Sequence, residues 1–565
     1  MDSEKIKVES AIVPADTHES HVPTIKPEIG PVSMKDNDRS SSDPEFQTVG
    51  NNEPLDTTPS KDLEANTELP SAPLHTVFNR SQRISIVVMI TLASFFSPLS
   101  GQIYYPAIPD IANEYHTTTG RINLTITTYM ILQGLAPTIM GTFGDTTGRR
   151  PAYIVTFIIY LAANIGLALQ KSYAALLVLR CFQSAGSSGT VALAFGVLAD
   201  IATPAERGKY LGPAAAGNML APAIGPTIGG LLAQYLGWRS IFWFLTIVSG
   251  SYVVVYALFM PETSRNVVDD GSIPPSDWWV TSPFQYWSAR REKKRAIREG
   301  RGDEFDEKEK KARELAEKRK FQFPNPLASI LVLREKDACI VICFTALGML
   351  VMMSSLASLP TLFGVAYGFS TFKVGLCYIP VGGAAIFAAL LNGKVMDWNY
   401  RRWAKKLNMP LEKKRNTDLR GFPIEKVRLQ PVFFFTPLIA ATYIPFGWVL
   451  QKRVNLAVPL ILEFIMAYCQ VSCSNCLSSL LVDLFPDKPS TVMAANNLVR
   501  CWVSGAGAAA IAYMLEGMGW GWCYTFLGLI YVLATTLPWI EYRWGMSWRE
   551  TREKRRKELE DQQKS

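Results

Sequence analysis

The stretch GTFGDTTGRR, from Gly141 to Arg150, decides how this chain is organised. It follows an apolar run that is long enough to cross a bilayer. A second stretch, GKVMDWNYRR from Gly393 to Arg402, follows another such run. Both read Gly-x3-Asp-x3-Arg-Arg, and each closes the second run of a set of six. This agreement at equivalent positions predicts two homologous six-helix halves joined by a long loop, the plan of a transporter with a site between its halves.

Composition sets the fold class. Of 565 residues, 48% are hydrophobic and 19% are charged, whereas a soluble domain carries about 25% charge. The hydrophobic residues gather into runs of about 20 residues, the length that a membrane helix needs. This excludes a soluble enzyme and a β-barrel, and it predicts an all-α membrane protein. The net charge is +8, and the basic residues lie between the apolar runs. In that position we expect them to set the membrane topology and not to bind nucleic acid.

The apolar runs predict twelve membrane-spanning helices. Their expected ranges are 84–106, 122–143, 151–169, 173–198, 208–235, 239–260, 337–362, 371–395, 431–450, 457–481, 491–514 and 521–541.

Around these spans we expect five parts. They are a disordered tail (1–80), an N-terminal six-helix half (81–262), a central loop (263–335), a C-terminal six-helix half (336–543) with a loop at 397–428, and a second tail (544–565). Lys and Arg concentrate in the loops that share a side with the two termini, which predicts that both tails and both long loops are cytoplasmic. The plasma membrane is the expected location, with the vacuolar membrane as the alternative.

The charges of the repeated loop suggest that it acts as a gate. Asp145 can pair with Arg149, and it can also face the positive end of a neighbouring helix. We therefore expect the loop to hold the two halves together on the cytoplasmic side and to release them when they rock apart. The alternative is a simple positively charged turn. The expected gating residues are Gly141, Asp145, Gly148, Arg149, Arg150, Gly393, Asp397 and Arg401.

The first copy resembles the signature loop of the major facilitator superfamily. The fifth run, from Gly217 to Gly230, is similar to the antiporter motif of the drug:proton antiporter branch, and Arg180 to Gly186 resembles that branch's fourth-span motif. Ser184 stands where that motif usually has glycine. Further short stretches resemble the twelve-span fungal subgroup with quinidine-resistance pumps and citrate and itaconate exporters; they are 96–99, 103–107, 482–486 and 495–501. The resemblance covers residues 75–550 and implies a major facilitator fold.

The fifth run also has a meaning of its own. Small residues recur every four positions, which lets another helix approach closely, and two prolines remove backbone hydrogen bonds. We expect this helix to seal one side of the transport cavity and so to favour exchange over uniport. The alternative is ordinary packing of small residues. The residues of this motif are Gly217, Pro222, Gly225, Pro226, Gly229 and Gly230.

Polar residues inside the spans are the candidates for the substrate and proton route, because charges at that depth usually line a cavity. Arg180, with Gln183 one turn on, can bind a carboxylate or repel a proton; a structural tether is the alternative. Glu463 is the candidate proton carrier, or else an interfacial residue. Asp200 and Asp483 end equivalent helices and are expected as caps or inter-half ion pairs. The other route candidates are Asn496, Asn497, Arg500 and Tyr104, the last of which can line the exit path or belong to the aromatic belt.

These features predict a proton-coupled exporter that carries a drug, toxin or secondary metabolite out of the cell. Export of a di- or tricarboxylic acid is the close alternative, because two arginines lie mid-membrane. A transporter-like nutrient sensor is a third reading, and sugar uptake, suggested by Pro261–Arg265, is disfavoured. We expect no enzyme activity, no cofactor beyond the proton gradient, no metal site and a monomer that contacts the bilayer, protons and a small-molecule substrate.

Overall fold

The computed structural model describes residues 76–203, 206–273, 279–298, 307, 310–312, 314, 326–407, 422–486 and 488–564. The tail expected before residue 76 and large parts of the central and 397–428 loops lie outside these described residues. In the described ranges the regular structure is entirely helical.

The N-terminal half contains six long helices. The elements are α1 (Arg80–Gln102), η1 (Tyr105–Ala107), α2 (Ile108–Glu114), α3 (Thr119–Thr147), α4 (Arg149–Leu169), α5 (Tyr173–Ile201), α6 (Arg207–Leu236) and α7 (Arg239–Phe259).

The remaining elements form the central segment and the C-terminal half. They are α8 (Arg265–Val268), α9 (Pro283–Arg298), α11 (Pro326–Leu331), η2 (Val332–Arg334), α12 (Lys336–Tyr367), α13 (Thr371–Leu376), α14 (Ile379–Lys406), α15 (Ile424–Gln451), α16 (Ala457–Leu484), α17 (Pro489–Met518), α18 (Trp520–Ala534) and α19 (Thr536–Lys564).

The expected membrane fold is confirmed. Ten helical segments of the described chain are long and apolar enough to cross a bilayer. The other two expected spans are α3 and α6, helices of 29 and 30 residues whose polar and small residues lower their hydropathy. Several helices run past the apolar segments: α14 continues to Lys406 and α15 begins at Ile424. Polar residues extend a helix beyond the bilayer because water satisfies their side chains there.

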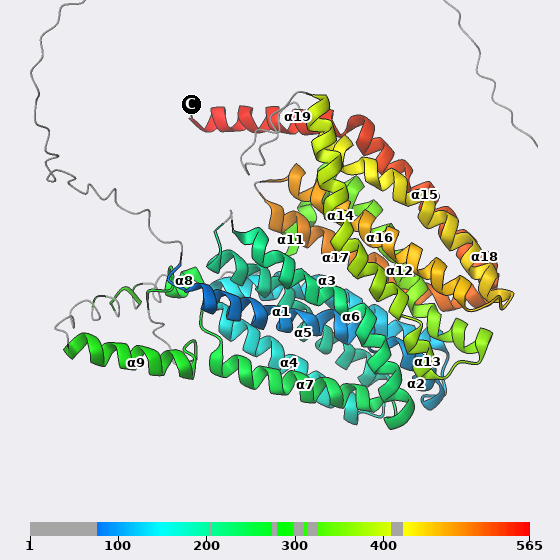
Figure 1. The fold of residues 1–565 in the computed structure, drawn as a ribbon, viewed down its shortest axis with the longest axis horizontal. Coiled ribbons are helices and arrows are strands. Elements are labelled where there is room, and N and C mark those ends of the chain that lie inside the picture. The colour runs from blue at the N-terminus through cyan, green and yellow to red at the C-terminus, as the bar shows by residue number, and fades with distance from the viewer. Residues whose placement is uncertain are drawn as a thin grey trace, which may run out of the picture. The chain divides into compact units, whose positions relative to one another are not determined.

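Helix packing repeats between the halves. In the N-terminal half α1 packs on α6, α4 on α5 and α7, and α3 on α5; in the C-terminal half α12 packs on α17, α15 on α16 and α18, and α14 on α16. Each C-terminal pair joins the helices equivalent to an N-terminal pair, as two homologous halves would. In Figure 1 the helices α1–α7, blue to green, lie together, and the yellow to orange helices of the second half lie beside them.

The halves meet along two reciprocal helix pairs, α3 with α17 and α6 with α13 and α14. Small residues bring these backbones close. A Cβ on Gly134 would lie 3.2 Å from the carbonyl oxygen of Leu498, and one on Gly230 would lie 2.6 Å from that of Thr371. A Cβ on Gly382 would overlap the backbone of Ala223. Close approach of helices at small residues is what stabilises association inside a bilayer.

We therefore expect Gly382→Val to destabilise this arrangement by about 1–3 kcal/mol, the usual cost of overpacking. The matched control is Gly393→Val in the same helix, because a Cβ on Gly393 has nothing within 4 Å. The measurement is the melting temperature of each purified variant. Equal melting temperatures for the two variants would contradict a close seam at Gly382.

Candidate functional site

The segment from Gly141 to Arg150, called here the latch loop, comprises the last two turns of α3, which ends at Thr147, the junction residue Gly148, and the start of α4 at Arg149. Gly148 has φ +111°, a conformation that favours glycine. Asp145 and Arg149 form an ion pair of 2.6 Å, and the Nε of Arg149 lies 2.9 Å from the Oδ2 of Asp200 at the end of α5. One guanidinium thus joins three helices.

Glu262, just after α7, completes the turn from the other side. Its carboxylate accepts four backbone N–H groups, from Arg149 at 2.9 Å, Arg150 at 3.0 Å, Thr263 at 2.9 Å and Ser264 at 2.8 Å. A negative group at the N-terminus of α4 satisfies donors that the helix leaves free and opposes its dipole. Burial raises the pKa of Glu262, and the four N–H groups act in the opposite direction.

Arg150 donates to the carbonyl oxygens of Ala257 and Trp279, at 2.8 and 3.0 Å. The partners of Asp145, Arg149 and Arg150 named above therefore all lie within or directly after the N-terminal half. That the latch loop also holds the two halves together stays a prediction. Here it ties together helices of one half.

The second copy of the motif also needs correction. Gly393, Asp397 and Arg401 lie inside the continuous helix α14, so they form no turn. The reason is visible in the sequence, because Tyr400 stands where the first copy has Gly148. A bulky residue disfavours the positive φ that the turn requires.

The ion pair of the first half is nevertheless repeated. Arg428 of α15 places its Nε 2.8 Å from the Oδ2 of Asp483 at the end of α16, as Arg149 does with Asp200. Asp200 and Asp483 were expected as caps or as ion pairs between the halves; each instead pairs within its own half. In this ion pair the counterpart of Arg149 is Arg428.

Arg180 lies fully inside the N-terminal half and is 1% exposed. Its guanidinium carbon is 4.3 Å from the ring centre of Tyr104 and 4.4 Å from that of Tyr129. It donates to Gln183 at 2.5 Å, and Gln183 donates to Asn164 at 2.7 Å. Within the described residues no carboxylate lies within ion-pair distance of Arg180. The faces of two aromatic rings offset its charge instead.

Tyr104 is therefore packed inside the half, against Arg180. Its neighbour Tyr105 reaches the other half: the ring stacks on Tyr378 with centroids 6.2 Å apart, and its hydroxyl lies 3.6 Å from the sulfur of Met353. The sequence predicts Tyr104 as an exit-path or aromatic-belt residue. The structure makes Tyr105 the aromatic residue that bridges the halves.

Glu463 in α16 is buried, and neither carboxylate oxygen has a hydrogen-bond partner among the described residues. Tyr378, Tyr443 and Tyr524 are close enough to interact with it electrostatically. Its side chain is therefore enclosed by neighbouring helices in this conformation. An ionised carboxylate without a partner is costly in such surroundings.

Of the three polar residues of α17, Asn497 lies at the contact with α3. Arg500 donates to Asn497 at 2.9 Å, and Asn497 donates to the carbonyl oxygen of Gln133 at 3.2 Å, across the two halves. The Oδ1 of Asn496 is buried without a partner among the described residues.

The small residues of α6 face two neighbours. A Cβ on Gly225 would lie 3.3 Å from the backbone nitrogen of Ile103, and one on Gly229 would overlap the carbonyl of Ile103. These two glycines therefore allow α6 to pack closely on the C-terminal end of α1, which Ile103 directly follows. Pro226 and Gly230 lie against α13 of the other half. The backbone of Gly217 lies in α6, and Pro222 and Pro226 leave α6 a single helix.

The halves are closed at the end of the bundle opposite the latch loop, called here the far end. Thr371 donates to Asp110 at 2.9 Å, and the backbone N–H of Phe372 donates to Gln234 at 2.9 Å. Thr127 donates to the carbonyl of Gly505 at 2.8 Å. In the described part of the chain, the hydrogen bonds between the halves given above all lie at the far end or toward mid-bundle.

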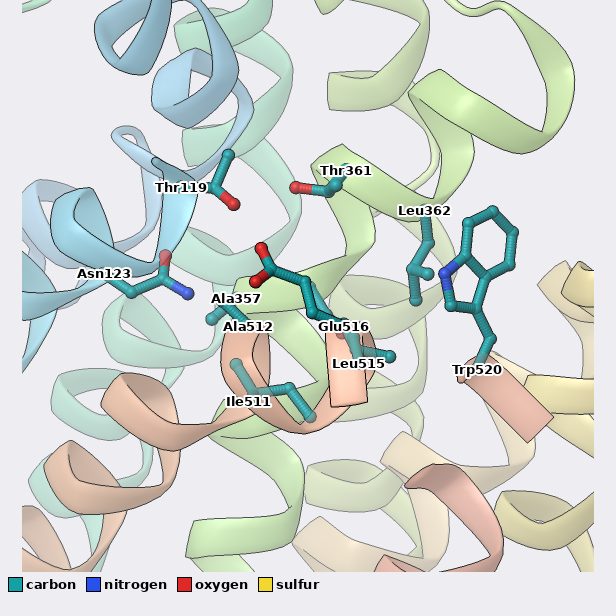
Figure 2. Close-up of a pocket in the computed structure, with 11 residues that line it drawn as sticks. Thr119, Asn123, Ala357, Thr361, Leu362, Ile511, Ala512, Leu515, Glu516 and Trp520 are labelled. Carbon is teal, nitrogen blue, oxygen red and sulfur yellow. The ribbon is translucent and has the colours of Figure 1, made fainter. Parts of the chain in front are cut away.

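A cavity of about 130 Å³ opens at the far end between the halves (Figure 2). Its walls come from α3 of the first half and from α12, α17 and the start of α18 of the second. The lining residues are Thr119, Asn123, Ala357, Ser358, Thr361, Leu362, Ile511, Ala512, Leu515, Glu516 and Trp520. Glu516 is the single charged residue among them; it belongs to no repeated motif and lies near the end of a span, so the sequence does not single it out. Glu262 is visible in the sequence only as part of Pro261–Arg265, which does not indicate its contacts with α4.

Comparison with known proteins agrees with this architecture. The family model described as "Major Facilitator Superfamily" matches residues 90–508. The MFS-type transporter phiD of a fungal species is 43% identical over 84% of this chain and 70% of its own length. Citrate exporter 1 of Aspergillus niger is 35% identical over 86% of this chain and 90% of its own. The xylose transporter XylE from E. coli, solved in a partially occluded inward-open conformation, has a TM-score of 0.53 at 12% identity, over 82% of this chain and 98% of that one.

The two equivalent ion pairs predict unequal stabilities. Arg149 and Asp200 expose 9% and 10% of their side chains, whereas Arg428 and Asp483 expose 19% and 25%. Removing one partner of a buried pair costs about 3–5 kcal/mol, and exposure reduces that cost. We expect Asp200→Asn to lower the melting temperature of the purified protein clearly more than Asp483→Asn. The opposite order would show that burial does not decide the strength of these pairs.

Proposed function

Because the chain belongs to the Major Facilitator Superfamily, we propose that it is a proton-coupled exporter, moving a small organic compound out of the cell while a proton enters. As a member of this superfamily the chain is a multi-pass membrane transporter of a small molecule, not an enzyme. The direction, the coupling to protons and the substrate are the proposed part. A drug, toxin or secondary metabolite is the proposed cargo, and the plasma membrane, with both termini cytoplasmic, is the proposed location.

The observation that carries the proposal is the closed far end between two otherwise similar halves. Thr371 and Asp110, Phe372 and Gln234, and the stacked rings of Tyr105 and Tyr378 all join the halves there. Alternating access requires these contacts to break when the far end opens. With cytoplasmic termini, the closed far end is the outer end, which an exporter must open to release its cargo.

Arg180 is tied to this opening through its neighbours. The Tyr105 ring that stacks across the halves follows directly after Tyr104, whose ring covers Arg180. Separation of the halves would remove Tyr378 from Tyr105 and loosen the cover over Arg180. We propose that Arg180 and Gln183 contact the route in that state, with Asn496, Asn497 and Arg500 contributing from the opposite half.

Glu463 is the proposed proton carrier. It is buried and unpartnered among the described residues, so its charge would be costly in this conformation and proton binding removes that cost. Rocking of the halves that admits water would favour release of the proton. One chain contains both halves of this route, so a monomer suffices.

Export of a di- or tricarboxylic acid is the second candidate. The similarity to Citrate exporter 1 favours it, as does the presence of two arginines, Arg180 and Arg500, inside the spans. In this conformation Arg180 is covered by rings and Arg500 is bonded to Asn497. An anion could therefore reach Arg180 only after the halves move.

The test is efflux from cells that overexpress the protein, with external metabolites profiled without preselection and with a protonophore as a second condition. We expect one compound class to accumulate outside, and the protonophore to stop it. Accumulation of carboxylic acids would select the second candidate. Unchanged external metabolites, or faster uptake, would contradict export.

For the compound so identified, we expect Glu463→Gln to lower the rate of transport against the compound's own concentration gradient by at least about tenfold, because an amide cannot carry a proton. Exchange of labelled for unlabelled compound without a proton gradient is the matched control, and it should continue in the same variant. Uphill transport that survives in Glu463→Gln would remove Glu463 from the proton route. Loss of exchange as well would assign the residue a structural role.

A further inference from the structure

The last helix, α19, is held to the C-terminal half by two arginines. The Nε of Arg549 lies 3.2 Å from the Oε1 of Glu425 at the start of α15. Arg552 pairs with Asp337 at the start of α12, and it donates to the carbonyl oxygen of Leu484 at the end of α16, at 2.9 Å. These contacts, called here the α19 clasp, therefore tie together the ends of three helices.

A third carboxylate, that of Glu541, lies in the α19 clasp. Its side chain is fully buried, and neither of its oxygens has a hydrogen-bond partner in the part of the chain that the structure describes. It is close enough to Asp337 and Glu425 to interact with them electrostatically. A Cβ on Gly545 would overlap the Oε1 of Glu541 and would lie 3.1 Å from the Cγ of Glu425. The two glutamates therefore flank the same bare stretch of backbone.

The charges of the α19 clasp do not balance, because three carboxylates face two guanidinium groups. The helices packed against α19 are α12, α15 and α18, and α18 has no charged residue. The remaining charged groups of α12 and α15 are engaged elsewhere: Lys336 is exposed, Lys426 lies over the ring of Tyr542, and Arg428 pairs with Asp483. Two carboxylates in one buried place repel each other when both are ionised. One bound proton removes the excess charge.

The N-terminal half shows what keeps a buried carboxylate ionised at the equivalent place. Glu262 follows α7 and accepts four backbone N–H groups around the start of α4. Glu541 follows α18 and approaches the start of α15, but it accepts none in the described chain and has a second carboxylate beside it. A protonated carboxyl is neutral and can donate a hydrogen bond to its neighbour. We propose that Glu541 and Glu425 share one proton, taken from cytoplasmic water, and that this proton keeps the α19 clasp closed.

The shared proton makes the α19 clasp sensitive to pH. Its loss leaves two negative groups side by side in a buried place, and opening of the clasp returns them to water. The closed clasp thus binds one proton more than the open one, so its stability falls as the pH rises. A rise in cytoplasmic pH would release α19 from α12, α15 and α16. This control site is separate from the proton carrier proposed at Glu463.

The test uses purified full-length protein and measures hydrogen exchange of the backbone N–H groups of α19 after Gly545. Protection factors are compared between about pH 6 and about pH 9, after correction for the intrinsic pH dependence of exchange. We expect protection to fall as the pH rises, by up to about tenfold per pH unit, which is the limit for one proton. Protection that does not change with pH would overturn the proposal. Because no transport is measured, that result would leave the proposed export untouched.

Glu541→Gln should keep α19 protected at both pH values, because the amide has the shape of the protonated acid and no charge to gain. Glu550→Gln is the matched control, since Glu550 is an exposed carboxylate of the same helix, and it should keep the pH dependence of the unmodified protein. A pH dependence that survives in Glu541→Gln would assign the proton to another group. Loss of protection at both pH values would give Glu541 a purely structural role. Either result contradicts the proposal.

The proton itself can be observed in the infrared spectrum at neutral pH, where a protonated carboxyl group has a C=O band that a carboxylate lacks. We expect Glu541→Gln to remove the band of one such group, because Glu425 then ionises against Arg549. Glu550→Gln should remove none. Any protonated carboxyl elsewhere, Glu463 included, contributes equally to all three spectra and cancels in the differences. An unchanged band in Glu541→Gln would show that Glu541 and Glu425 hold no proton.

Discussion

The two halves contact each other almost backbone to backbone along the seam of α3 with α17 and of α6 with α13 and α14, and the rest of the structure depends on that contact. Gly134 lies against the backbone of Leu498, and Gly382 lies against that of Ala223. Lipid provides no hydrophobic force between helices, so close packing and hydrogen bonds have to hold the seam. Contacts of this kind are lost as a unit when the helices separate. The seam can therefore open completely without any change within either half.

Within each half, unlike at the seam, an ion pair at the latch-loop end holds the helices together. Arg149 and Asp200 join α4 to α5, and Arg428 and Asp483 join α15 to α16. Glu262 adds four backbone hydrogen bonds where α4 begins. Ion pairs at one end hold helices of the same half together, while small residues along the seam join the halves. This division suits a protein whose halves move as bodies.

The sequence predicts the fold well, because a bilayer demands long apolar helices and internal backbone hydrogen bonds. It also predicts that Asp145 pairs with Arg149. It fails where the partner is distant in the chain: no local pattern pairs Glu262 with the start of α4 or Arg428 with Asp483, and burial of Arg180 between two rings depends on how α1, α3 and α5 pack. The second copy of the motif forms no turn, because Tyr400 stands where the first copy has Gly148. Burial of Glu463 required the structure, since helix depth alone left it near the interface.

The central claim is that two rigid halves rock about a seam that is closed here at the far end. Distances between spin labels test it most directly, with one pair at residues 110 and 371 and another at residues 147 and 394, in the protein cycling under a proton gradient. The account predicts opposite changes: populations in which the far-end distance lengthens have a shorter distance at the latch-loop end. Two distances that lengthen together, or a far-end distance that never changes during transport, would contradict it.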